Sequence, residues 1–263
     1  MQRIEGQPKE AEREHFATSR IVVKIGSQTI TEGATSENPL NTELIDSIAR
    51  QCSHLHNNGV GVVIVSSGAV ACGRHLLSIE ERSTQDRQVE ALYGQPTLIS
   101  TWVAAFRKYG VTAGQALITE HDLAEAKKVL QKSLQFGVVI VNINDAVSRE
   151  EIDELLDLAD NDRTAEEVAD AVKADTVLML TDVDGVLDAN NKLIEDGFQV
   201  KDGSDFFEGS EKGTGGMRTK VERLRSLANR GVKGVIARAT REDIVLEVAR
   251  GNTEGISTTF EAK

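Results

Sequence analysis

A glycine-rich turn that opens into a helical pattern is the part of this sequence best suited to chemistry. Residues 213–220 read GTGGMRTK, and apolar residues at helical spacing continue to Gly231. Glycines let the backbone approach an anion, and the first amides of a helix have no partner inside it. With the helix dipole and the charge of Lys220, they predict a phosphate site. The run is neither a P-loop nor a Rossmann fingerprint, and a glycine-rich connection without a ligand is the alternative interpretation.

A second cation interrupts an apolar run. Lys24 stands within residues 21–25, and Gly26 and a serine follow. An apolar side chain would pack better there, so the lysine either snorkels to solvent or binds an anion. Two lysines at one anion site need a carboxylate to hold them in place. Asp160, Asn161 and Asp162 precede a predicted helix near Thr164 and offer that carboxylate, although helix capping explains either aspartate singly.

Polar residues also follow three other predicted strands. Ser67 and Gly68 lead into a helical stretch, where the serine is either a helix cap or a ligand for a carboxylate. Asp145 ends the run 142–145. Thr181 and Asp182 begin the run 181–185, which is suited to a ribose, a base or a metal, or else to a simple turn. The five histidines show no zinc-binding spacing, and we expect no protein-built metal site.

The elements that must position these residues alternate along the chain. Short apolar runs alternate with segments of helical periodicity, which is typical of βαβ units around a mainly parallel sheet in an α/β protein. In such sheets ligands bind beyond the carboxyl ends of the strands, where the polar runs lie. Strands are predicted at 21–25, 62–65, 116–118, 138–141, 177–180 and 235–237. Helices are predicted at 40–55, 69–77, 84–108 with an interruption at 94–96, 121–135, 164–172, 221–231 and 241–250.

The composition limits the class of partner. The 263 residues carry a formal net charge of −12, which argues against nucleic-acid and membrane-surface partners. The two cysteines lie in apolar helical patterns and are predicted to be buried thiols in a reducing compartment, the cytoplasm. No apolar run is long enough to span a membrane. Residues 1–19 are polar, carry no signal-peptide pattern and are expected to be a mobile tail before one domain at 20–263.

Taken in order, these segments resemble the amino acid kinase superfamily, and within it the glutamate 5-kinases most. The resemblance spans about Ile21 to Phe260, and the combination of VSSGAVA with GTGGM-x-TK is highly specific. The motifs are VVKIGS at 22–27, RQCSHLH at 50–56, VIVSSGAVACGR at 63–74, YGQ at 93–95, VVIVNINDAV at 138–147, DNDRTAEEVA at 160–169, ADTVLMLTDVDGV at 174–186 and GTGGMRTK at 213–220.

The resemblance implies a three-layer sandwich and ATP-dependent phosphorylation of the γ-carboxylate of L-glutamate, the first step of proline synthesis. It implies that Lys24 and Lys220 flank the transferred phosphoryl group and that Asp162 organises them. Its further implied site residues are Ser67, Gly68, Asp145 and Asn161 for the amino acid, and Lys24, Gly26, Thr181, Asp182, Thr214, Gly215, Gly216, Met217, Arg218, Thr219 and Lys220 for ATP.

The resemblance also implies partners. Mg²⁺ would bridge the phosphate oxygens, the chain would form a homo-oligomer, and the acyl phosphate could pass directly to a glutamyl-phosphate reductase. Such an active site works mainly by positioning and positive charge, which fits the lysines and the glycine-rich turn.

The sequence departs from the family pattern at three places, of which the first two bear on the identity of the substrate and on feedback inhibition. Ile143 stands where the family commonly has glutamate, and the acidic insert at 148–159 is longer than usual. We also expect no C-terminal PUA domain, which many members carry, because the sequence ends soon after Phe260. A related kinase for another small acid or a glutamate analogue is therefore one alternative function. A catalytically silent amino-acid or nucleotide sensor is another, although the presence of both lysines and Asp162 counts against it.

Overall fold

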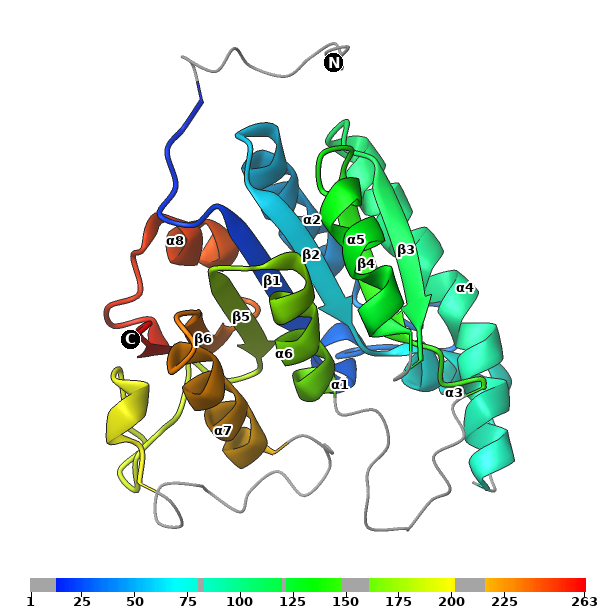
Figure 1. Cartoon of the computed structure of the whole chain (residues 1–263). Helices are drawn as coiled ribbons and strands as arrows, with labels where there is room; N and C mark the ends of the chain where they lie inside the picture. Colours follow the sequence, from blue (N-terminus) through cyan, green and yellow to red (C-terminus); the bar gives the residue numbers. More distant parts are fainter. Residues whose placement is uncertain (1–12, 80–82, 120–121, 148–160, 202–215) are drawn as a thin grey trace.

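A single seven-stranded sheet organises the molecule (Figure 1). The computed structural model describes residues 13–79, 83–119, 122–147, 161–201 and 216–263. The strand order is β3-β4-β2-β1-β5-β6-β7, and β7 alone in this sheet is antiparallel to its neighbour. The strands are β1 (Arg20–Ile25), β2 (Gly61–Ser66), β3 (Ala113–Ile118), β4 (Val138–Ile143), β5 (Thr176–Thr181), β6 (Lys233–Arg238) and β7 (Ser257–Phe260).

Helices cover both faces of the sheet, which gives the predicted three layers (Figure 1). One face carries α1 (Ser27–Ile30), α2 (Thr42–Asn57), α3 (Ala69–Leu77), α4 (Thr84–Lys108) and α8 (Ile244–Arg250). The other carries α5 (Leu123–Ser133), α6 (Asn161–Val172) and α7 (Met217–Ala228), and a 3₁₀ turn, η2 (Gly197–Gln199), precedes α7 in the chain. The predicted α/β class is confirmed.

Side-chain alternation along β1 decides where Lys24 goes. Val23 belongs to the apolar core beneath α2 and α4, whereas Val22 belongs to the core beneath α5, α6 and α7. Successive side chains of a strand point to opposite faces. The side chain of Lys24, near the carboxyl end of the central strand β1, therefore points toward α6 and α7.

Several element boundaries differ from the sequence prediction. Helix α4 runs unbroken through Pro96 instead of stopping at residues 94–96, because apolar side chains that follow the proline, Leu98 and Trp102 among them, are buried in the core on this face of the sheet. Their packing outweighs the backbone hydrogen bond that the proline removes. Helix α6 begins at Asn161 and not near Thr164, so Asp162 lies inside its first turn. Strand β7 was not predicted.

The described part of the predicted tail is not a free segment. Phe16 is buried, the amide of Ala17 donates to the carbonyl of Ala249 at 2.8 Å, and Glu14 pairs with both His54 and Arg250. Residues 13–19 therefore pack against α2 and α8, which moves the expected start of the domain toward the N-terminus. Residues 1–12 lie outside the described part of the chain.

Helices α3 and α4 approach each other closely at two glycines. A Cβ atom at Gly73 would lie 1.8 Å from the carbonyl oxygen of Glu90, and one at Gly94 would lie 1.9 Å from that of Ala69. These distances leave no room for a methyl group. The contact fixes α3, whose first residue follows Gly68, and so helps to position the turn after β2.

We expect Gly94→Ala to lower the free energy of unfolding by about 1–3 kcal/mol, because the added methyl group forces the two helices apart. Urea unfolding followed by circular dichroism measures the change. Gly114→Ala is the matched control, because the space around Gly114 in β3 is open; its effect should stay within about 0.5 kcal/mol. Equal stability of the two variants would contradict the close helix contact.

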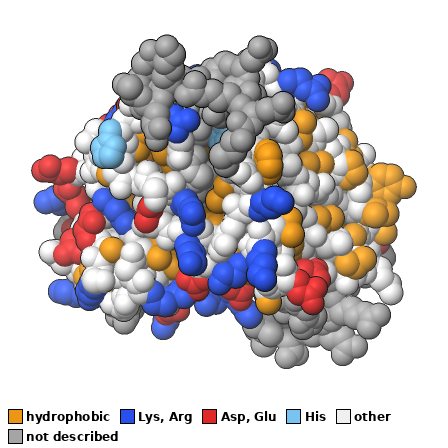
Figure 2. Space-filling view, turned by 45° about the horizontal axis from the view of Figure 1, so that its top comes forward, with side chains coloured by type: hydrophobic (Ala, Val, Ile, Leu, Met, Phe, Trp, Pro, Cys, Tyr) orange, Lys and Arg blue, Asp and Glu red, His pale blue; other side chains and the backbone are white. Residues whose placement is uncertain are grey.

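The surface separates charged from apolar regions. Figure 2 shows basic side chains beside acidic ones over the middle and lower part of this face, and hydrophobic side chains toward the right, the side on which Figure 1 places β3 and α4. Large apolar side chains exposed on α4 include Val89 and Tyr93.

Both cysteines are buried free thiols, as predicted. Among the described residues, no helix is both long and apolar enough to cross a membrane.

Candidate active site

A buried carboxylate joins the two lysines that the sequence singled out. The Nζ atom of Lys24 lies 2.6 Å from Oδ1 of Asp162, and that of Lys220 lies 3.1 Å from Oδ2. The Asp162 side chain is 1% exposed, and the lysine side chains are 7% and 12% exposed. The three groups come from β1, α6 and α7, so the fold brings together residues almost 200 positions apart.

The charge of this cluster follows from its geometry. Burial alone raises the pKa of the Asp162 carboxyl, but the ammonium groups of Lys24 and Lys220 outweigh burial and hold the pKa below its ordinary value. The carboxylate is therefore ionised at neutral pH. Two cations against one anion leave a local excess of positive charge in a chain of net charge −12, and that excess suits a polyanion.

The start of α7 adds backbone donors beside Lys220. Gly216 is its N-cap, and the first backbone bond runs from the amide of Thr219 to the carbonyl of Gly216 at 3.0 Å. The amides of Met217 and Arg218 precede this bond, so they point out of the helix end. The hydroxyl of Thr219 also donates to Gly216, while the side chain of Arg218 pairs with Glu222 at the surface. Thr214 and Gly215 lie outside the described residues.

The turn after β5 is held by an arginine that sequence reasoning missed. Arg238, the last residue of β6, donates from Nε to Oδ1 of Asp184 at 3.0 Å and from Nη1 to the carbonyl of Asp182 at 2.5 Å. The hydroxyl of Thr181 donates to the Asp182 carboxylate at 2.9 Å. Asp184 therefore stabilises the turn, whereas the exposed carboxylate of Asp182 remains accessible.

The turn after β2 is positioned by its neighbours. The amide of Ser67 donates to the carbonyl of Ile25 at 3.1 Å, which ties this turn to the end of β1. Trp102 of α4 donates to the Ser66 hydroxyl, which in turn donates to the Ser67 carbonyl, each at 3.1 Å. Gly68 has a φ of 115° and caps α3 without a side-chain hydrogen bond.

Asp145 and Asn161 differ in their surroundings. Asp145 is half-buried in the turn that follows β4. Asn161 opens α6 next to Asp162, and no described residue donates to its buried Oδ1 atom. A buried carbonyl oxygen without a donor is costly, so this acceptor is suited to a ligand N–H group. The acidic insert 148–159 and Asp160 lie outside the described residues.

Most of the predicted site residues lie at one edge of the sheet. Lys24, Gly26, Ser67, Thr181 and Asp145 are near the carboxyl ends of β1, β2, β5 and β4, and Asn161, Asp162 and the start of α7 belong to helices that meet this edge. The fold and this cluster define an α/β protein with two lysines and a buried carboxylate at the carboxyl ends of its parallel strands. A family model described as the amino acid kinase family matches residues 19–238. The chain belongs to that family.

Relatives of known function show which members of the family this chain resembles. The glutamate 5-kinases of Caldanaerobacter subterraneus subsp. tengcongensis, Clostridium acetobutylicum and Symbiobacterium thermophilum are each 34% identical to this chain. The matches cover 92%, 90% and 92% of this chain and 67%, 93% and 95% of the relatives, respectively. These matches confirm the resemblance to glutamate 5-kinases that the motifs indicated.

A solved structure supports the fold independently. The UMP kinase of Ureaplasma parvum superposes with a TM-score of 0.58 and covers 93% of this chain and 99% of its own. At 14% identity this likeness concerns the fold alone.

Proposed function

We propose that this protein transfers the γ-phosphoryl group of ATP to the γ-carboxylate of L-glutamate, forming L-glutamyl 5-phosphate for proline synthesis. The single observation that carries the proposal is the Asp162 carboxylate held between Lys24 and Lys220. The similarity to glutamate 5-kinases along 90% or more of the chain supports the choice of acceptor. A catalytically silent sensor would be expected to lack one of these charged side chains, whereas this chain has both lysines and Asp162.

The reaction needs charge and alignment more than covalent chemistry. An oxygen of the γ-carboxylate forms a bond to the γ-phosphorus while the bond from that phosphorus to the bridging oxygen breaks, and that oxygen leaves with its electron pair on ADP. The γ-carboxylate is already ionised at neutral pH, so no general base is required. Lys24 and Lys220 stabilise the negative charge around the phosphorus, and Asp162 keeps their two ammonium groups in position.

The amino acid is held at the ends of β2 and β4 in this proposal. Asp145 accepts a charge-assisted hydrogen bond from the substrate ammonium, and the unsatisfied Oδ1 of Asn161 accepts a second N–H. A carboxylate of the amino acid binds at Ser67, Gly68 and the first amides of α3, because that helix end has no side-chain cap. Asn161 neighbours Asp162 in α6, so the bound amino acid lies next to the lysines.

In this proposal ATP binds along the rest of the same sheet edge, beside the amino acid. Its phosphates lie against Lys24, Gly26 and the start of α7 from Gly216 to Lys220, with Thr214 and Gly215 in the same loop, and its nucleoside lies near Thr181 and Asp182. No group of three or more metal-binding side chains exists in the described part of the chain, and Asp162 is occupied by two ammonium groups. We therefore propose that the phosphate oxygens of ATP, and not a set of protein side chains, would bind Mg²⁺, which would screen their charge.

The cellular setting completes the proposal. Exposed apolar side chains on α4, such as Val89 and Tyr93, support a homo-oligomer. The unpaired cysteines fit the reducing conditions of the cytoplasm. Because acyl phosphates hydrolyse readily, direct transfer of the product to a glutamyl-phosphate reductase is part of the same proposal.

Hydroxylamine trapping tests this function. Purified protein is incubated with ATP, Mg²⁺ and hydroxylamine and with each of several small acids, and hydroxamate formation is measured. We expect L-glutamate to give the highest kcat/KM. Hydroxamate from a different acid only would replace the substrate and keep the kinase class, whereas none from any acid would overturn the enzyme proposal.

A further inference from the structure

Helices α6 and α7 lie side by side on one face of the sheet, and ion pairs join them along their length (Figure 1). The acidic partners Asp162, Glu166 and Asp170 are four residues apart on α6, so they lie along one side of that helix. The basic partners belong to α7 and to the turn that follows it. In chain order the pairs are Asp162 with Lys220, Glu166 with Arg223 and Arg230, and Asp170 with Arg230. The first pair belongs to the proposed active site, and the next begins one helical turn further along.

Glu166 makes the most extensive of these contacts. Its Oε1 atom accepts hydrogen bonds from Nη2 of Arg230 at 2.5 Å and from the Ser226 hydroxyl at 3.0 Å, and its Oε2 atom accepts one from Nη1 of Arg223 at 3.3 Å. The Glu166 side chain is 13% exposed. A mostly buried carboxylate with three donors holds a neighbouring helix more firmly than an isolated surface ion pair does.

The apolar contact between the two helices is less directional. Ala165 and Ala169 of α6 share a core with Val221 and Leu224 of α7. Apolar burial holds such helices close together, whereas charge-assisted hydrogen bonds also have preferred distances and angles. The contacts of Glu166 therefore favour one placement of α7 along α6.

Lys220 depends on this placement more than the other two charges of the site do. Lys24 stands on the central strand β1 and pairs with Asp162 at 2.6 Å, so these two groups are held together without α7. Lys220 lies one turn before Arg223, so the contacts of Glu166 fix α7 next to Lys220. A displacement of about 1 Å in a group that aligns reactants can lower a rate by roughly a hundredfold.

We propose that Glu166 is a positioning residue for phosphoryl transfer, which holds α7 against α6 so that the Lys220 ammonium stays at the transferred phosphoryl group. The inference rests on the proposed function. Glu166 acts through Lys220 and contacts neither substrate. Its effect should therefore appear in kcat.

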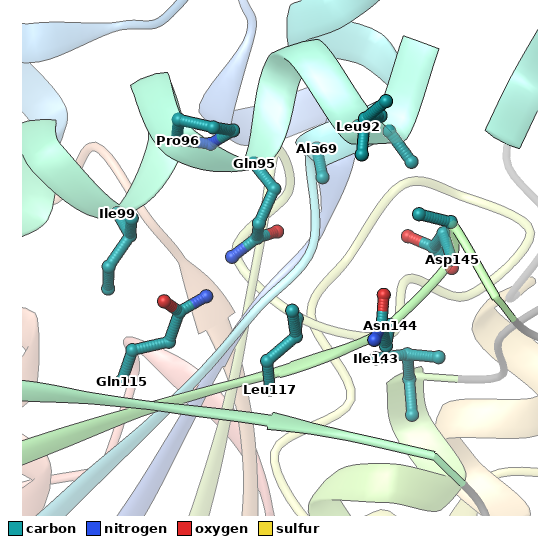
Figure 3. Close-up of a pocket in the computed structure, with 12 residues that line it drawn as sticks. Ala69, Leu92, Gln95, Pro96, Ile99, Gln115, Leu117, Ile143, Asn144 and Asp145 are labelled. Carbon is teal, nitrogen blue, oxygen red and sulfur yellow. The ribbon is translucent and has the colours of Figure 1, made fainter. Parts of the chain in front are cut away.

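The amino-acid part of the site has different support. Figure 3 shows Asp145 beside a hollow between α4 and β3, to which Gln95 of α4 and Leu117 of β3 contribute. Helix α4 covers the face of the sheet opposite to α7. The KM for glutamate should therefore change little when the contacts of Glu166 are removed, whereas kcat should fall.

Glu166→Gln tests this role, because the amide keeps the size of the side chain and removes its charge. In the hydroxylamine assay we expect kcat to fall by about tenfold or more and the KM for glutamate to stay within about twofold. Glu167→Gln is the matched control. Glu167, the next residue of α6, pairs with Arg163 of the same helix at the surface, so this change should leave kcat within about twofold of the parent value.

A double-mutant cycle separates positioning from general stability. Glu166→Gln is combined with Lys220→Ala, and phosphoryl transfer from labelled ATP is measured at saturating substrate. If Glu166 acts by placing Lys220, its replacement should cost less than about twofold in kcat once Lys220 is gone. A loss as large as in the parent background would show that Glu166 acts independently of Lys220, and it would overturn the proposal.

Arg230→Gln removes a donor to Glu166 from the exposed side of the contact, so it tests the role even if Glu166→Gln does not fold. It should lower kcat by about threefold or more, again with little change in the KM for glutamate. An unchanged kcat in this variant would contradict the positioning role.

Failure of the positioning role and failure of the proposed function are distinguishable. If the parent protein forms hydroxamate from glutamate and Glu166→Gln keeps its full kcat, the positioning role is overturned and the kinase stands. If the parent protein forms no hydroxamate from any acid, the proposed function is overturned, and the role of Glu166 with it.

Discussion

Replacing Lys220 or Lys24 with alanine should lower kcat for glutamyl phosphate formation by about 10²–10³-fold or more, the usual effect of removing one group that stabilises transition-state charge. Each ammonium lies within 3.1 Å of the Asp162 carboxylate and is mostly buried, so water replaces its charge poorly. ATP affinity should fall less than kcat, because the lysine matters most as charge moves during transfer. Steady-state kinetics and ATP binding measured by calorimetry separate the two quantities.

Asp162→Asn completes this test. The variant should fold and yet lose most activity, because the amide no longer holds two ammonium groups in one geometry. Lys108→Ala serves as the control, since Lys108 pairs with Asp46 at the surface and should leave kcat unchanged. Near-normal turnover of Lys24→Ala or Lys220→Ala would remove that lysine from the mechanism.

Asp145→Asn should raise the KM for glutamate by roughly ten- to a hundredfold, because the substrate ammonium loses a charge-assisted hydrogen bond worth about 1.5–3 kcal/mol. The KM for ATP should barely change. The change is isosteric and lies in a half-buried turn, so little loss of stability is expected. Steady-state kinetics with each substrate varied in turn measure both constants.

Glutarate distinguishes ammonium binding from loop support. It lacks the ammonium, so it should be a poor substrate of the parent protein and lose little further in Asp145→Asn. If Asp145 only supports the turn, the variant loses activity on glutamate and glutarate alike. Equal losses would therefore contradict the assigned role.

Local patterns in the sequence allowed the α/β class to be predicted, whereas the pairing of Asp162 with Lys24 and Lys220 was predicted from the family resemblance. Buried parallel strands read as continuous apolar runs, and Lys24 is conspicuous within one of them. The interruption that the sequence predicted in α4 is wrong for a physical reason. Pro96 indicated an interruption locally, but burial of Leu98 and Trp102 keeps α4 continuous. Tertiary packing is not visible in a local pattern.

The residues that support the site from neighbouring elements could not be predicted from the sequence either. Arg238 holds the turn after β5 from the neighbouring strand β6, and Trp102 holds Ser66 from α4. Nothing in their local sequence marks either residue, because the contacts join positions far apart in the chain. The contacts of Glu166 likewise depend on how α6 lies against α7, which only the assembled fold defines.

Oxygen transfer from substrate to phosphate tests the central claim most directly. Glutamate labelled with ¹⁸O in its γ-carboxylate is incubated with the protein, ATP and Mg²⁺, and released phosphate is examined by ³¹P NMR after the acyl phosphate has cyclised. In γ-carboxylate phosphorylation the bridging oxygen comes from the carboxylate and leaves with phosphorus when the amine attacks the carbonyl carbon. We predict one ¹⁸O per phosphate from the labelled carboxylate, and none with Lys220→Ala above background. Phosphate released without ¹⁸O at the parent's full rate of ATP consumption would show that water, not glutamate, accepts the phosphoryl group.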